Sequence, residues 1–600
     1  MIVSEDELLP FYQRELAYLR HMGAAFARRF DKIAGRLEVG PEQGRDPHVE
    51  QLIESFALLT GRVQYNLDAE FPLITAGLLG ILYPQFLDPV PSMTIARFDA
   101  DPARVKLTSG YTVPKGTPLF AEGEDGSVCR MRTCYPVTLW PVAVTGADVA
   151  TPDQLDVEVP DAVAVLRIRL ASLGAPLHTF DLATLRLFVR ADPILSARLY
   201  ELLTCQVRWI GVRTPGSGPV RRLPRGAVAP VGFAADEDVL PYPPQAQPAY
   251  RLLQEYLEFA DKFLFLDVTG LDTSGLDREA ELVFALNRTP PRQLEVDRDT
   301  FVPGCAPVIN LFTRPSEPIR LTQRRTEYRL VADLRHERIT EVHSVRSVSA
   351  SPLPGEGTAV VAPFFSFDHA HTERTPSVYW LARRETTGRA DLPGTDVWLS
   401  FVDLDLKAAV PPERTVYAHV LCTNRSLAEQ LPAGARLQVE QPLPVHAISC
   451  LRKPTPQRTP ILGGSTAWKL VSQLSLNHLS LAGGEVALQA LREIVRLHGG
   501  NPNAQVDRQL LALRSMTSRP VVHRIGADAW RGFVRGTEIT LEIDERAFAG
   551  GNPMLFAAVL NHFFALYASV NAFTQLVVTS TQRPEVWKRW PPMIGYQPVL

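Results

Sequence analysis

Cysteine, lysine and long apolar runs are all scarce in this chain. Its six cysteines are scattered over 600 residues; only Cys129 and Cys134 lie close together, and no second pair completes a four-cysteine zinc site. The most apolar long stretch, residues 556–570, is interrupted by Asn561 and His562 and is too short to cross a bilayer. Because few cysteines and no signal peptide fit a reducing compartment, we expect a cytoplasmic protein.

The chain also lacks a net charge of one sign. Its 62 cationic and 65 anionic residues leave a net charge of −3, so no global field draws it to nucleic acid or to an acidic membrane. Only eight of the cationic residues are lysines, and we interpret the excess of arginine as codon bias rather than phosphate binding. The aromatic and basic segment 587–591 (WKRWP) is expected to dock on the protein's own surface or on a partner.

Catalytic motifs are missing from the sequence as well. It contains no His-Glu-x-x-His pair, no Gly-x-Ser-x-Gly elbow and no Walker loop. His369 and His371 could share a metal with Asp368 or Cys422, although two histidines in a loop are more often surface residues. We therefore expect no catalytic residue, no cofactor and no metal. The alternative from another class is an effector or cell-wall enzyme with a metal at these two histidines.

The first ninety residues predict three amphipathic helices. Apolar side chains recur every three or four residues over 8–37, 46–67 and 71–83, which places them along one stripe of each helix. The second helix begins at Asp46-Pro47, where a carboxylate can cap the helix and proline is favoured at its first position. Such stripes must pack inside this chain or against another, and we predict contact with a partner. The side chains expected to contribute are Leu16, Leu19, Phe26, Phe30, Phe56 and Val63.

After the helical start, the pattern changes to short alternating runs separated by glycine and proline. Many short strands with regular turn signals indicate a sandwich or barrel-like domain. Near residue 351 a Pro/Gly-rich segment marks a boundary, and beyond it helical and strand patterns mix. We therefore expect an α+β multidomain protein. Its predicted parts are an N-terminal helical region 1–90, a β-rich domain 91–215, a second β-rich domain 216–350 and a mixed α/β C-terminal region 351–600.

A series of short sequence blocks runs in order along the chain. The strongest is LPFYQRELAYLR at 9–20. The others are 32–37, 46–50, 68–72, 82–84, 89–93, 252–256, 310–312, 422–425, 474–477, 535–541 and 566–571. Together they resemble the TssF (ImpG/VasA) family of type VI secretion system baseplate subunits. One mild departure is that Phe11 and Gln13 stand where we expect a Tyr and an Asn.

The resemblance implies a structural wedge component of the type VI secretion system baseplate, without enzyme activity, at the cytoplasmic face of the inner membrane. The implied partners are TssG, a second copy of TssF, TssE and TssK. The inner membrane complex, the tube and sheath, and the spike are indirect partners. Neither nucleic acid nor a small-molecule substrate is expected. The alternative is the equivalent wedge protein of a phage tail or of a phage-derived contractile particle.

Overall fold

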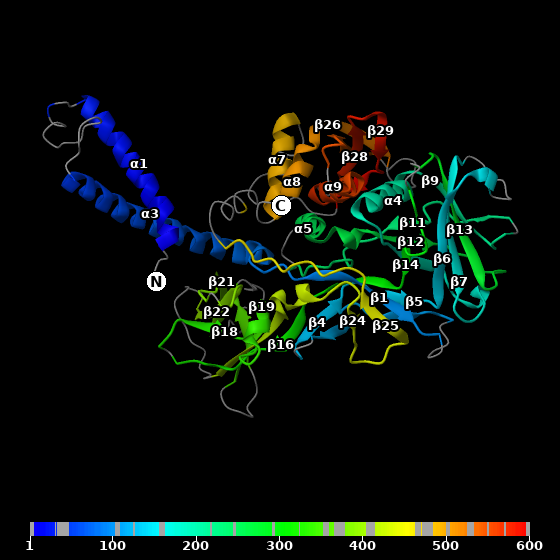
Figure 1. The fold of residues 1–600 in the computed structure, drawn as a ribbon, viewed down its shortest axis with the longest axis horizontal. Helices are drawn as coiled ribbons and strands as arrows, with labels where there is room; N and C mark the ends of the chain where they lie inside the picture. The colour runs from blue at the N-terminus through cyan, green and yellow to red at the C-terminus, as the bar shows by residue number, and fades with distance from the viewer. Residues whose placement is uncertain are drawn as a thin grey trace. The chain divides into compact units, whose positions relative to one another are not determined.

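The chain divides into two compact units, Met1–Ile81 with Ile461–Leu474, and Leu82–Pro460 with Ser475–Leu600 (Figure 1). The computed structural model describes residues 5–29, 32, 47–102, 108–123, 126–154, 162–216, 219–243, 248–290, 294–322, 324–351, 359–364, 378–389, 391–403, 415–462, 470, 484–499, 504–524, 533–548, 551–568 and 572–595. Among these residues, no helix is both long enough and apolar enough to span a membrane.

Two long helices, α1 (Glu5–Arg29) and α3 (Pro47–Leu82), make up most of the described part of the first unit. The expected helices 46–67 and 71–83 are one helix that continues through Pro72, so the predicted break was wrong. A proline inside a helix costs about 3 kcal/mol. However, the residues after it, LITAGLLGIL, include no Asn, Asp or Pro that would favour a turn, and each further residue adds a helical hydrogen bond.

The second unit contains a six-stranded sheet whose strands come from distant parts of the chain. Its order is β24-β25-β1-β15-β4-β3, and β1 pairs antiparallel with both β15 and β25. The strands are β1 (Met93–Ala100), β3 (Pro118–Glu122), β4 (Val128–Thr133), β15 (Cys305–Ile309), β24 (Arg436–Leu437) and β25 (Val445–Cys450). One core joins this sheet to the two-stranded sheet of β2 (Tyr111–Val113) and β5 (Val137–Leu139). The sheet that begins in the predicted β-rich domain 91–215 is thus completed by residues far along the chain, and the four predicted domains stay a prediction.

Two further sheets lie in the same unit, together with two helices. The five-stranded sheet comprises β10 (Arg221–Arg222), β9 (Val207–Arg213), β13 (Glu279–Leu286), β7 (Ala164–Ser172) and β6 (Val142–Ala150), in that order. The four-stranded sheet comprises β11 (Val228–Pro230), β12 (Phe265–Thr269), β8 (Thr184–Val189) and β14 (Phe301–Pro303). The helices are α4 (Pro193–Cys205) and α5 (Pro248–Phe259).

An eight-stranded sheet follows in the order β16-β23-β19-β20-β21-β22-β18, with β17 paired to β23. Its strands are β16 (Phe312–Pro315), β17 (Ile319–Arg320), β18 (Glu327–Leu330), β19 (Glu341–Ser351), β20 (Ala359–Pro363), β21 (Tyr379–Thr386), β22 (Thr395–Val402) and β23 (Thr415–Thr423). Most of the Pro/Gly segment predicted as a boundary near residue 351 lies outside the described residues.

The C-terminal part is mixed α/β, as expected. Helix α9 (Pro553–Tyr567) connects the parallel strands β27 (Phe533–Ile543) and β28 (Phe573–Ser580), which forms a βαβ unit. The Asn552 side chain accepts a hydrogen bond from the Leu555 backbone N–H at 3.0 Å and so caps the start of α9. The remaining elements are α7 (Gly484–His498), α8 (Ala504–Leu511), β26 (Leu513–Arg524), β29 (Arg583–Arg589) and β30 (Met593–Ile594).

Two of the family blocks meet at a buried junction between the six-stranded and eight-stranded sheets. Asn310 follows β15 and Asn424 follows β23, and both side chains are buried. The Asn310 Nδ2 donates to Asn424 Oδ1 at 2.9 Å, and the Asn424 backbone N–H donates to Asn310 Oδ1 at 2.7 Å. The Arg130 backbone N–H also donates to Asn424 Oδ1, at 2.8 Å. Because buried amides must find partners, these blocks align the two sheets.

The segment 587–591 docks on the protein's own surface. The Trp587 indole Nε1 donates to Glu201 Oε1 at 2.9 Å, and Lys588 Nζ donates to the Thr204 carbonyl at 3.0 Å. Both partners lie on α4. This confirms one of the two uses expected for this segment.

His498, at the end of α7, is buried in an aromatic cluster of the second unit. Its ring stacks on Tyr250 with centroids 4.7 Å apart and meets the edge of Phe86 at 5.0 Å. Its Nδ1 lies 2.7 Å from the Ile494 carbonyl, so this nitrogen donates and carries the proton. Burial lowers the pKa of His498 from 6.5 to about 4.

A His498→Phe variant is expected to lose less stability in acid than the parent protein. Between pH 6.5 and about 4, this histidine binds a proton in the unfolded chain but not in the folded protein. It therefore destabilises the fold as the pH falls. Once the pH is below both pKa values, this destabilisation amounts to about 3 kcal/mol of the free energy of unfolding. Burial raises the pKa of Asp88 to about 6 and of Glu258 to about 7; these groups act in the opposite sense but equally in both proteins. Thermal unfolding measured from pH 7.5 to 4 tests this, and parallel losses in both proteins would contradict it.

Candidate functional site

Helices α1 and α3 form an antiparallel pair, which we call the arm (Figure 1). Arg20 on α1 donates from Nε to the Glu50 carboxylate on α3 at 3.0 Å. Farther along, a Cβ placed on Gly61 of α3 would lie 3.0 Å from the backbone nitrogen of Tyr12 on α1. From the first contact to the second, the position on α1 falls from Arg20 to Tyr12, whereas the position on α3 rises from Glu50 to Gly61. The two helices therefore run antiparallel.

A face of small side chains on α3 meets α1. Ala57 and Gly61 are both buried, and residues four apart lie on one helix face. Because the backbone of Tyr12 is so close to Gly61, any side chain at this position would push the helices apart. The small residues therefore decide which side of α3 faces α1.

The opposite side of α3 carries a row of large apolar side chains that the described residues leave exposed. Leu52, Phe56, Leu59 and Val63, which we call the α3 stripe, are 71%, 57%, 63% and 57% exposed. Their spacing of four, three and four residues places them in one line. At 100° per residue, the centre of this line lies about 150° around the helix from the Ala57 and Gly61 face. An exposed apolar line of this kind is typical of a helix that docks against another protein.

The structure sorts the expected partner-binding residues into three groups. Phe56 and Val63 belong to the α3 stripe, and Phe26 on α1 is also exposed. Leu16 and Leu19 are half-buried and share a helix face with Tyr12, next to α3. Phe30 lies outside the described residues.

Two members of the α3 stripe, Leu52 and Leu59, lie on the predicted apolar stripe but are not among the residues predicted to contact a partner. Both share the spacing of Phe56 and Val63, so periodicity alone could have included them. A further signal in the sequence is the pair of small residues four apart, Ala57 and Gly61. Because close helix packing favours small side chains at the contact, this pair indicates which face of α3 packs against α1.

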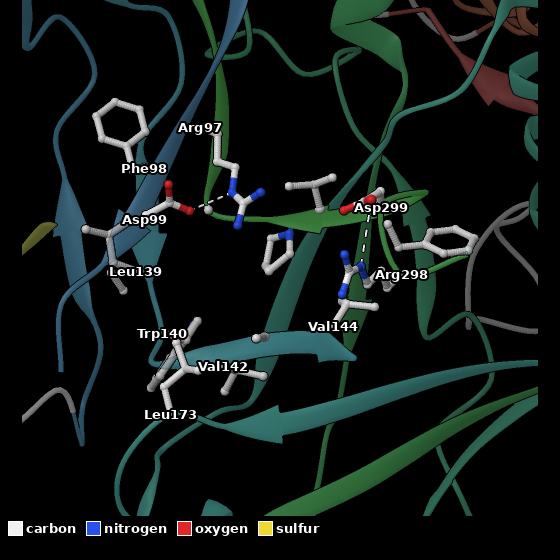
Figure 2. Close-up of a pocket in the computed structure, with 16 residues that line it drawn as sticks. Arg97, Phe98, Asp99, Leu139, Trp140, Val142, Val144, Leu173, Arg298 and Asp299 are labelled. Carbon is white, nitrogen blue, oxygen red and sulfur yellow. Dashed lines mark ion pairs between the residues drawn. The ribbon is translucent and has the colours of Figure 1, made fainter. Parts of the chain in front are cut away.

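A cavity of about 120 Å³ lies in the second unit, next to β1, β6 and β14 (Figure 2). Buried apolar side chains, among them Phe98 and Phe301, form part of its lining. Figure 2 shows Arg97 and Arg298 reaching into it from two sides, and Arg97 Nε lies 2.6 Å from the Asp99 carboxylate. Small-molecule sites usually measure about 300–1,000 Å³, so this cavity suits one side chain or a few waters.

The candidate metal ligands are only partly covered by the structure. His369 and His371 lie outside the described residues. Cys422 is buried in β23, and burial raises the pKa of its thiol to about 12, whereas metals bind the thiolate. Within the described ranges, no group of three or more His, Cys, Asp or Glu side chains could hold a metal ion.

Comparison with known proteins gives consistent matches over the whole chain. The family described as "Type VI secretion system, TssF" matches residues 4–597. The type VI secretion system component TssF1 of Pseudomonas aeruginosa is 37% identical, and the match covers 99% of each chain. A chain of the TssK-TssF-TssG baseplate subcomplex, solved by cryo-electron microscopy, matches with a TM-score of 0.73 and 26% identity over 92% of this chain and 99% of that chain. A chain of the baseplate complex from the type VI secretion system matches with a TM-score of 0.59 and 25% identity over 99% of this chain and 100% of that chain.

Proposed function

Because the chain belongs to the TssF family of the type VI secretion system, we propose that it is a structural wedge component of the baseplate without a catalytic role. The observation that carries this proposal is the match over residues 4–597 together with the fold shared with a chain of the TssK-TssF-TssG subcomplex. The full-length identity to a secretion-system component favours this role over that of a phage-tail wedge protein. Its proposed place is the cytoplasmic face of the inner membrane.

The proposed direct partners are TssG, TssK, TssE and a second copy of this chain. Through them the protein would support assembly of the tube and sheath and connect indirectly to the spike and the inner membrane complex. Subunits of such a ring bind through different surfaces on each copy, and large permanent interfaces are apolar. The α3 stripe supplies an apolar surface of this kind, and we assign it to the contact with TssG.

Co-expression of the chain with TssG and TssK from the same genome tests this function. We expect the three proteins to purify together and to elute as one complex, with two copies of this chain for each TssG. Light scattering and quantification of each subunit measure the stoichiometry. If folded TssG and TssK elute without this chain, the proposed function is wrong.

A further inference from the structure

The hairpin of β26 and β27 extends beyond the sheet to which it belongs. The two strands pair over their full length, from Leu513 opposite Ile543 to Arg524 opposite Phe533. On its other side, β27 pairs with β28 only from Gly536 onward. The last residues of the pair, 522–524 and 533–535, therefore have no strand of β28 beside them.

One face of this hairpin end carries both apolar and cationic side chains. Val522 lies opposite Arg535 and Arg524 opposite Phe533, so all four side chains point to the same face. Phe533 is 74% exposed and Val522 58% exposed, and both arginines are exposed. We call these four residues the hairpin patch.

The opposite face of the hairpin end packs onto the protein. His523 lies between Val522 and Arg524 in the strand, so it points to the other face. Its Nε2 is 3.1 Å from Gln575 Oε1, and its ring centroid is 5.3 Å from that of Phe573. Since both contacts lie on β28, the hairpin end is held in place while the hairpin patch faces solvent.

The charge of the hairpin patch is not balanced by the carboxylates that the structure describes. Arg519, on the same face of the strand as His523, contacts Glu538 at 2.6 Å. Among the described residues, by contrast, no carboxylate forms an ion pair with Arg524 or Arg535. Within the part of the chain that the structure describes, the patch therefore carries two positive charges without a paired carboxylate, in a chain whose net charge is −3.

We infer that the hairpin patch docks a segment of another baseplate subunit that carries apolar and acidic side chains, an inference that rests on the proposed function. Arginine and aromatic side chains are the residues enriched at protein interfaces, and unpaired guanidinium groups recognise carboxylates. Two arginines are too few for nucleic acid, where several phosphate contacts carry the affinity. A patch with one aromatic and one aliphatic side chain is also smaller than the apolar face that binds a membrane surface.

Photo-crosslinking in the intact bacterium tests this inference. The cross-linker p-benzoylphenylalanine is placed at position 533 of the full chain and, as a matched control, at the similarly exposed Leu334. We expect one cross-linked protein from position 533, through a peptide with apolar and acidic residues. Arg524→Glu together with Arg535→Glu should lower the yield about tenfold, because charge reversal turns attraction into repulsion. The exposed Arg338→Glu should leave the yield unchanged.

Several results would overturn the inference. These are a yield at position 533 no higher than at Leu334, cross-links to lipid or nucleic acid, or a yield that charge reversal does not lower. Co-purification with TssG and TssK is measured for every variant. Failure of the cross-link with intact co-purification rejects the hairpin patch and leaves the proposed function standing, whereas loss of the parent complex rejects the function itself.

Discussion

A chain with Phe56→Asp and Leu59→Asp is expected to stay folded and to lose its complex with TssG. Both side chains are more than half exposed, so neither aspartate disturbs a core. At an apolar interface, each would place a carboxylate where it loses water and finds no partner. With about 2 kcal/mol or more for each central contact, the affinity should fall roughly a thousandfold. Co-purification and a binding titration measure the loss.

Leu58→Asp is the matched control for this experiment. Leu58 is 47% exposed on the same helix, but its direction lies about 130° around the helix from the α3 stripe. This variant should bind TssG as the parent does. Retained binding by the Phe56 and Leu59 double variant would show that the α3 stripe is not the interface. Leu19 is a poorer choice, because it is half-buried beside α3 and an aspartate there would disturb the arm itself.

Replacing Lys262 by methionine is expected to destabilise the second unit by about 3–5 kcal/mol. The Lys262 and Glu255 side chains are both fully buried, and Lys262 Nζ lies 2.5 Å from the Glu255 carboxylate. That carboxylate also accepts the backbone N–H groups of Val239 at 2.7 Å and Leu240 at 3.0 Å. Burial lowers the pKa of Lys262, while the Glu255 carboxylate opposes the shift. Removing the ammonium leaves the buried carboxylate with only the more distant guanidinium of Arg251, whose Nε lies 3.7 Å away.

Thermal and urea unfolding, followed by soluble yield, measure this loss. Adding Glu255→Gln to Lys262→Met should recover much of it, because the glutamine oxygen still accepts backbone N–H groups and carries no charge. Arg288→Met breaks the exposed ion pair with Glu585 and should cost less than about 1 kcal/mol. A single variant as stable as the parent would contradict the assigned role of Lys262, as would a double variant no better than the single one.

The features of this chain differ in how far local sequence explains them. The start of α9 needs only Asn552 and Pro553, because a cap and a fixed φ act within one helical turn. Asn310 and Asn424 look unremarkable in sequence, and their role becomes visible only when the fold brings them to hydrogen-bond distance. The hairpin patch is similar, since pairing sets Phe533 opposite Arg524. The alternation of side chains between the two faces of these strands could be read from the sequence, but the exposure of the hairpin patch to solvent could not.

The sequence by itself determined most of the helical start, the alternation typical of strands and the family to which the chain belongs, but not the unbroken course of α3 through Pro72. These features depend on periodicity and on contacts within a few residues. Only the tertiary structure decided that β1 lies between β15 and β25 and that the α3 stripe faces away from α1. Strand partners and exposed faces depend on contacts between residues distant in the chain. On α3, two apolar faces compete, and the close approach of Tyr12 to Gly61 selects which one is buried.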